Sequence, residues 1–88
     1  QEAQALVGLA RTWLIHAEPP PPEAVALLDR AQSLLPTNHD ITLIKAHLLL
    51  RRREIQAAVD HYEKVVAWSR DPALVRQARE RLDAIEAV

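Results

Sequence analysis

Residues 24–35, AVALLDRAQSLL, and residues 58–69, AVDHYEKVVAWS, are two versions of one helical segment. An offset of 34 residues pairs the following positions: Ala24 with Ala58, Val25 with Val59, Leu28 with Tyr62, Ala31 with Val65, and Leu34 with Trp68. In both segments the apolar residues recur every three or four positions, which is typical of one face of an α-helix. A helix that returns after 34 residues indicates a repeat protein.

Prolines mark where the other helices begin and end. Pro19–Pro22 exclude a helix between about residues 16 and 22, because each ring removes an amide donor and restricts the residue before it. Pro36 ends the second helix, and Pro72 opens the last one after a good N-cap, Asp71. We predict five helices and no strand, with apolar stripes at Leu6–Ala17, Ala24–Leu35, Ile41–Leu49, Ile55–Val66 and Leu74–Ile85. The third helix should start at the cap residues 37–40 and end near Arg52, and the fifth should run from Pro72 to about Glu86.

The helices that precede the two quoted segments also match each other. At an offset of 36, Ala10 pairs with Ala46, Trp13 with Leu49, and Leu14 with Leu50. An alanine from each helix lets the two helices of a pair approach closely. Because Trp13 and Trp68 share repeat positions with Leu49 and Leu34, we expect both indoles to pack in the core.

These helix pairs resemble the tetratricopeptide repeat (TPR) family, whose unit is a helix-turn-helix of 34 residues. The matching positions are Leu6, Leu9, Ala10, Trp13, Ala24, Leu28, Ala31 and Pro36 in the first unit, and Ala46, Leu49, Ala58, Tyr62 and Val65 in the second. The sequence departs from the pattern at Lys45, a large apolar position, at Arg53, the turn glycine, at Val65, where alanine is usual, and at Pro72, which lies two residues late. The resemblance implies an all-α, right-handed helix-turn-helix repeat stack, a TPR-like α-solenoid of five helices. Residues 1–88 would form one domain with repeat 1 at about 3–36, repeat 2 at about 39–70 and a capping helix at about 72–86.

The resemblance also implies a binding surface, because in this family the first helix of each repeat lines a concave groove for a peptide or a partner helix. The positions carried over are Gln4, Val7, Arg11 and Leu14 from the first unit, and Asp40, Leu43, His47 and Leu50 from the second, with Arg51 at the margin. We expect His47 to become cationic at low pH and to strengthen binding there. Val7 and Leu43 stand where some members carry a carboxylate-binding Lys and Asn, which argues against binding of a chaperone's C-terminal tail. The function implied is a protein-protein interaction module or scaffold with a protein or peptide partner.

An alternative is a structural spacer or a sensor and regulatory segment of a multidomain protein. Its groove would then pack internally or against another copy. Val7, Leu14 and Ile15 lie outside the main apolar stripe of the first helix, so we also expect that the chain can associate with itself through this helix. Because the chain starts at Gln1 without a methionine, we expect it to be an excerpt of a longer protein.

Composition argues against most other functions. Eleven Lys and Arg against twelve Asp and Glu give a net charge of −1, which favours neither nucleic acid nor an anionic membrane. One glycine cannot supply a phosphate-binding loop, and the absence of cysteine excludes a thiol nucleophile and a zinc ribbon. The four histidines lack metal-ligand spacing, and no hydroxyl stands in a catalytic motif. We therefore predict no enzymatic activity, no cofactor, no metal site and no membrane span.

Arginine is the most distinctive charged residue. Arg51–Arg53 lie at the end of the third helix, where cations complement the helix dipole and can bond its last carbonyls, and Glu54 follows them. We interpret this run as structural and not as a nucleic-acid site. The excess of arginine over lysine, together with abundant alanine, suggests a bacterial source. Nothing in the sequence indicates a compartment, and the cytoplasm is the default expectation.

Overall fold

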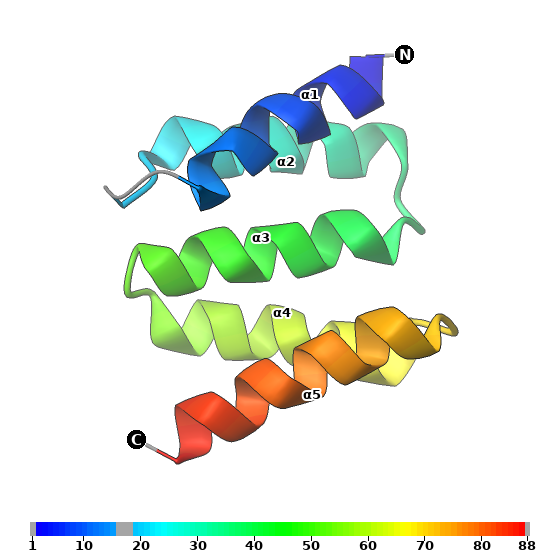
Figure 1. Cartoon of the computed structure of the whole chain (residues 1–88). Helices are drawn as coiled ribbons and strands as arrows, with labels where there is room; N and C mark the ends of the chain where they lie inside the picture. The colour runs from blue at the N-terminus through cyan, green and yellow to red at the C-terminus, as the bar shows by residue number, and fades with distance from the viewer. Residues whose placement is uncertain (1, 16–18, 88) are drawn as a thin grey trace.

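The computed structural model describes residues 2–15 and 19–87, and within them the chain is all-α (Figure 1). Its elements in chain order are α1 (Glu2–Arg11), the 3-10 turn η1 (Thr12–Leu14), α2 (Pro22–Leu34), α3 (His39–Arg51), α4 (Ile55–Trp68) and α5 (Pro72–Glu86). The prediction of an all-α fold with five helices is confirmed. The first helix was expected to end by about residue 16, with an apolar stripe from Leu6 to Ala17. Its α-helical part ends at Arg11, and Ala17 lies outside the described residues.

Side-chain caps fix where α3 and α5 begin. The Asn38 Oδ1 accepts hydrogen bonds from the amides of Asp40 at 3.0 Å and Ile41 at 3.3 Å. The Asp71 Oδ1 accepts one from the amide of Ala73 at 2.9 Å. Both side chains satisfy amides that have no partner inside the helix. The predicted cap at Asp71 and the predicted start of the third helix are therefore confirmed.

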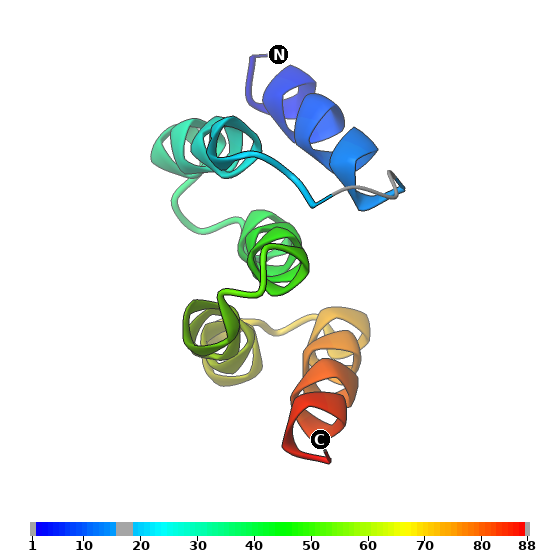
Figure 2. The same cartoon turned by 90° about the vertical axis from the view of Figure 1, so that its left-hand side faces the viewer.

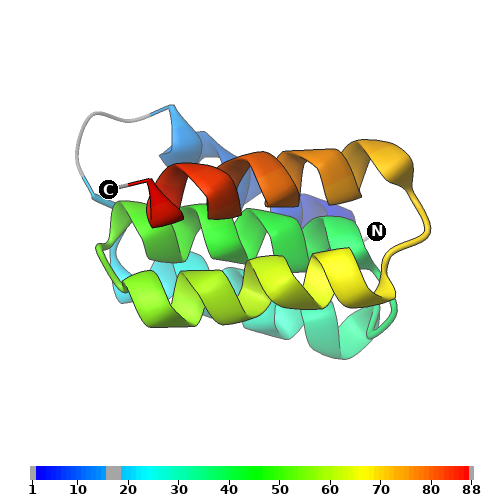
Figure 3. The same cartoon turned by 90° about the horizontal axis from the view of Figure 1, so that it is seen from below.

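The hydrophobic core consists of two clusters that meet at α3. The first joins α1, α2 and α3 through Leu6, Ala10, Ala24, Leu28, Ala31, Ile41, Ile44 and Leu48. The second joins α3, α4 and α5 through Leu43, Ala46, Leu49, Ala58, Tyr62, Val65 and Ala78. Seen from below, α3, α4 and α5 run along one another (Figure 3). Because α3 faces both clusters, it buries seven residues, more than any other helix.

The turn after α3 contains a residue in the left-handed region. Arg53 has a φ of 65°. The amide of Arg53 donates to the carbonyl of Leu50 at 2.9 Å, and the amide of Glu54 donates to the carbonyl of Leu49 at 3.0 Å. These two bonds form a Schellman motif, in which glycine is the usual residue at the left-handed position. Arg53 therefore holds a conformation that its Cβ disfavours.

The basic run at the end of α3 bonds another part of the chain. The guanidinium of Arg51 donates to the carbonyls of Trp13 at 2.9 Å and Leu14 at 2.5 Å. Arg52 donates to the carbonyl of Pro20 at 2.9 Å. These bonds were not part of the expectation for the run, and they tie the end of the first helix and the proline loop to α3. Arg51 and Arg52 therefore have a structural role, as predicted for this basic run.

The two tryptophans differ in their environments. Trp13 is partly buried against the first core cluster. Trp68 is 71% exposed, so the prediction that it packs in the core is wrong. Its repeat partner Leu34 is 48% exposed as well. Each is the last residue of its helix, where neighbouring helices no longer cover it, whereas the preceding partners, Ala31 and Val65, are fully buried.

Candidate functional site

The helices are arranged on two sides of the molecule. Figure 2 shows α1, α3 and α5 on one side, with α3 set back between the other two, and α2 and α4 on the opposite side. Three cavities open on the α1, α3 and α5 side, which we call the concave face. They are lined by α1 with α3, by the Leu14 turn with α3 and α5, and by Leu50 and Ile55 with α5. Among the described residues, no helix is long and apolar enough to cross a membrane.

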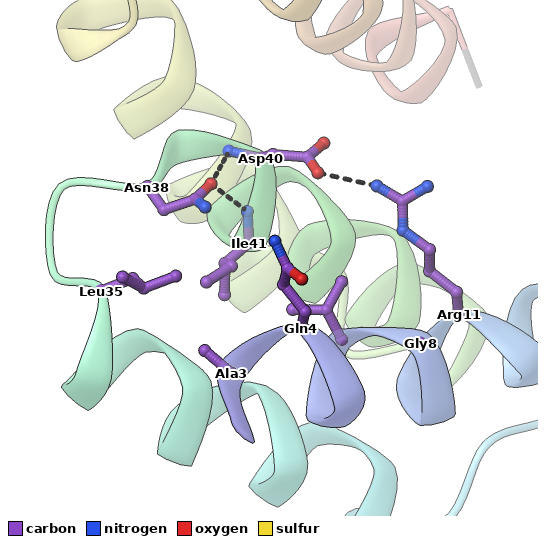
Figure 4. Close-up of a pocket in the computed structure, with 9 residues that line it drawn as sticks. Ala3, Gln4, Gly8, Arg11, Leu35, Asn38, Asp40 and Ile41 are labelled. Carbon is purple, nitrogen blue, oxygen red and sulfur yellow. Dashed lines mark hydrogen bonds and ion pairs between the residues drawn. The ribbon is translucent and has the colours of Figure 1, made fainter. Parts of the chain in front are cut away.

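The cavity between α1 and α3 has a volume of about 310 Å³ and is lined by residues of both helices, among them Gln4, Val7, Arg11 and Asp40, and by Leu35 and Asn38 of the α2–α3 connection (Figure 4). Arg11 donates to the Oδ2 of Asp40 at 2.7 Å, which ties α1 to α3. Both side chains are exposed, so this ion pair contributes at most about 1 kcal/mol. The structure therefore brings Val7, Arg11 and Asp40 together as expected, with the two charges neutralising each other.

His47 does not supply a cation to this face. Its Nδ1 lies 2.6 Å from the hydroxyl of Tyr62, and the two rings are tilted with centroids 5.4 Å apart. Burial, followed by the positive charge of Arg81, lowers the pKa of His47 to about 4. Burial also raises the pKa of Tyr62 to about 12. His47 is thus neutral near pH 7, and the expectation that it strengthens binding as pH falls toward 6 is wrong.

Leu43 was expected to line the groove, but its side chain is only 3% exposed. It belongs to the second core cluster, with Ala78 of α5 among its members and Leu74 and Leu82 packed against it. The fifth helix covers this turn of α3, so Leu43 cannot contact a partner without unfolding. Its role is in the core, and its assignment as a binding residue is corrected.

Leu14 and Leu50 line a second cavity of about 200 Å³ together with His47, Arg51 and Arg81. Both leucines are half-buried. Because the guanidinium of Arg51 bonds the carbonyls of Trp13 and Leu14, it fixes the wall of this cavity. These predicted groove residues therefore lie together, with Arg51 acting as the link between η1 and α3.

The third cavity contains residues that the sequence reasoning missed. It has a volume of about 320 Å³ and is lined by Leu50, Ile55, Arg81, Ala84 and Ile85. The fifth helix was interpreted only as a cap, whereas it contributes three of these residues. Arg81 and Ile85 are four residues apart, so they lie on the same face of the helix. This spacing is the sequence signal that could have identified them. Arg81 also reaches the second cavity, so it stands between the two.

In the described part of the chain, no three His, Asp or Glu side chains come together as a metal site would require. No family model, no curated protein and no solved structure matches the chain.

Proposed function

We propose that the chain is a non-catalytic protein-protein interaction module that binds a peptide or a partner helix on its concave face. The observation that carries this proposal is the 320 Å³ cavity, which four apolar residues line beside the exposed guanidinium of Arg81. Its volume is at the lower end of the range for ligand pockets. It suits an apolar anchor side chain, which supplies most of the affinity in such complexes.

The polar rim defines the chemistry of the partner. Arg81 borders both the second and the third cavity. A carboxylate next to the apolar anchor would pair with this guanidinium, which adds orientation and association rate more than affinity. The partner we propose is therefore a segment with apolar anchors flanked by acidic residues.

The repeat pattern of the sequence supports the same proposal. The repeat partners Ala24 and Ala58, and also Leu28 and Tyr62, are all fully buried, as helix-crossing positions of two similar units would be. We propose two TPR-like repeats at about 3–36 and 39–70 with a capping helix, acting as a scaffold. Solenoid proteins of this kind bind along their concave surfaces.

A second candidate, a segment that packs against another copy or a neighbouring domain, rests on a different observation. Leu9 and Ile15 of the first helix region are 57% and 87% exposed. Large apolar side chains that stay exposed can belong to an interaction surface. Sedimentation over a range of concentrations separates the two candidates, because only self-association depends on the concentration of the chain and weakens in Leu9→Ser with Ile15→Ser.

The proposed function is tested with a synthetic amphipathic peptide that carries leucines at helical spacing flanked by glutamates. Amide chemical-shift mapping should give shifts in α1, α3 and α5. Arg81→Glu should weaken binding at least tenfold, since it places a like charge beside the ligand carboxylate. Arg79→Glu is the matched control, because Arg79 is also an exposed arginine of α5 but lines none of the three cavities. Shifts confined to α2 and α4, or equal affinities of the two variants, would show that the concave face is not the binding site.

A further inference from the structure

A fourth cavity, of about 250 Å³, opens on the side of the molecule opposite the concave face. It lies where the C-terminal ends of α2 and α4 meet the first two turns of α3, near the α2–α3 and α4–α5 loops that share one end of the molecule in Figure 1. Its lining residues are Gln32, Pro36, His39, Thr42, Lys45, His61, Lys64 and Trp68. Two lysines, two histidines and an exposed tryptophan thus surround one hollow, and no carboxylate lines it.

The floor of this cavity is held rigidly by hydrogen bonds. The Nε2 of Gln32 donates to the carbonyls of Leu35, Pro36 and Asn38 at 3.2 to 3.3 Å. The hydroxyl of Thr42 donates to the Oε1 of Gln32 at 3.1 Å. Because these groups are already hydrogen-bonded, the floor of the cavity does not have to rearrange when a ligand binds. Less binding free energy is then spent on ordering the protein.

The walls supply cations at two depths. Lys45 lies deep, with a side chain only 14% exposed, and its Nζ is 2.7 Å from the Oδ1 of Asp29. An ammonium group has three donors, so one such contact leaves capacity for a second acceptor. Lys64 is exposed at the rim. An anion entering this cavity would meet Lys64 first and Lys45 at its base.

His61 reports the electrostatics of the cavity. Its Nδ1 is 2.8 Å from the carbonyl oxygen of Ala57. Because a carbonyl only accepts hydrogen bonds, Nδ1 carries the proton. Nε2 can therefore accept a hydrogen bond when the ring is neutral and donate one when the ring is protonated. Burial lowers the pKa of His61, Lys45 and Lys64 lower it further, and the Ala57 carbonyl and Asp29 oppose the shift. A bound anion would oppose it as well.

Trp68 gives the site an apolar component. An exposed indole beside a charged cavity is the type of side chain that contributes most to binding when a partner covers it. The net charge of −1 disfavours a nucleic acid, which needs an extended basic surface. A short peptide needs only one local cluster of cations and one apolar contact.

We propose that this cavity is a second binding site, which takes a peptide carrying an anionic side chain, a carboxylate or a phosphate, next to an apolar residue. Lys64 and Lys45 contact the anion, and Trp68 contacts the apolar neighbour. The site is separate from the concave face, since α3 lies between them, and it does not depend on the function proposed above. Arg81 and the cavities of α5 have no part in it.

The test uses three synthetic pentapeptides, acetyl-Ser-Leu-X-Leu-Ser-amide, in which X is glutamate, phosphoserine or glutamine. Binding is followed by the indole amide signal of Trp68, which the Trp68→Ala variant distinguishes from that of Trp13, and by the ring signals of His61. We expect the two anionic peptides to shift both reporters and to raise the pKa of His61. The glutamate peptide should therefore bind more tightly as pH falls from 7.5 to 5.5, whereas phosphoserine loses part of its own charge over the same range. The glutamine peptide should bind at least tenfold more weakly.

Two variants test the named contacts, with circular dichroism to verify that each is folded. Trp68→Ala should weaken the anionic peptides by about tenfold or more. Lys64→Gln should weaken them by about two- to fivefold, as expected for one exposed ion pair. Arg79→Gln, an exposed residue of α5 that lines none of these cavities, should leave the affinity unchanged.

Several results would overturn the proposal. If the glutamine peptide binds as tightly as the two anionic peptides, the site does not recognise an anion. If inorganic phosphate binds as tightly as the phosphoserine peptide, Trp68 does not contact an apolar neighbour of the anion. Tighter binding of single-stranded oligothymidine than of any peptide would assign the cavity to a nucleic acid. A silent Trp68 signal, with shifts only in α1 and α5, would place the peptides on the concave face.

Discussion

Acidification should destabilise the protein through His47 in a way that can be isolated with one substitution. The pKa of His47 is about 4 in the folded chain, against 6.5 for an ordinary imidazole. The folded state therefore binds fewer protons than the unfolded state between these values, and acid favours unfolding. The stabilisation is fully present above pH 6.5 and is lost as pH falls from 6.5 toward 4. Each unit of pKa difference between the folded and unfolded states is worth about 1.4 kcal/mol, so this difference would change the free energy of unfolding by about 3 kcal/mol. Because His47 is only partly buried, we expect about 1–2 kcal/mol.

The assay is urea unfolding followed by circular dichroism at pH 7.5, 6, 5 and 4, for the wild type and His47→Gln. Glutamine preserves a polar partner for the hydroxyl of Tyr62 but does not titrate. Other groups, His61 included, titrate in both proteins, so their effect cancels in the comparison. The free energy of unfolding of the wild type should fall by about 1–2 kcal/mol more than that of the variant. Parallel pH profiles for the two proteins would refute the assignment of a buried, neutral imidazole.

Three further predictions concern stability, each measured as a shift in denaturant midpoint at pH 7.5. Arg53→Gly should stabilise by about 0.5–1 kcal/mol by removing a Cβ from a left-handed residue, and a stabilisation as large in Arg53→Ala would contradict this reason. Ala58→Leu should destabilise by about 1–3 kcal/mol through overpacking of a fully buried site, whereas exposed Arg79→Ala should stay within about 0.5 kcal/mol, so the reverse order would disprove the assigned helix faces. Leu43→Glu should destabilise by about 3 kcal/mol or more because its charge would be buried without a partner. A variant as stable as the wild type would show that Leu43 is not a core residue.

The sequence was sufficient for the features that depend on local chemistry. Proline and the cap residues Asn38 and Asp71 define the helix starts, because capping depends on a few neighbouring residues. The fully buried positions Ala24 and Ala58 follow from the 34-residue repeat. These signals needed no information about distant contacts.

Features that depend on the end of a helix or on distant packing were not predictable in the same way. Repeat position predicted a buried Trp68, but Trp68 is the last residue of α4 and is 71% exposed, although Val65 in the same turn is fully buried. Leu43 is buried because α5 covers it, and its sequence neighbourhood does not encode that contact. The same packing brings Arg81 to His47 and suppresses its charge. The concave face therefore required the placement of α5, which was interpreted only as a cap.

The position of α3 between two core clusters determines how the protein unfolds. Each cluster takes one face of the same helix, so neither half of the chain keeps a complete core without it. Opening one half would expose apolar side chains of α3 that no other helix could cover. The halves are thus expected to lose structure together, and the amides of α3 to exchange with solvent only through global unfolding. The protein should then behave as one cooperative unit in hydrogen exchange.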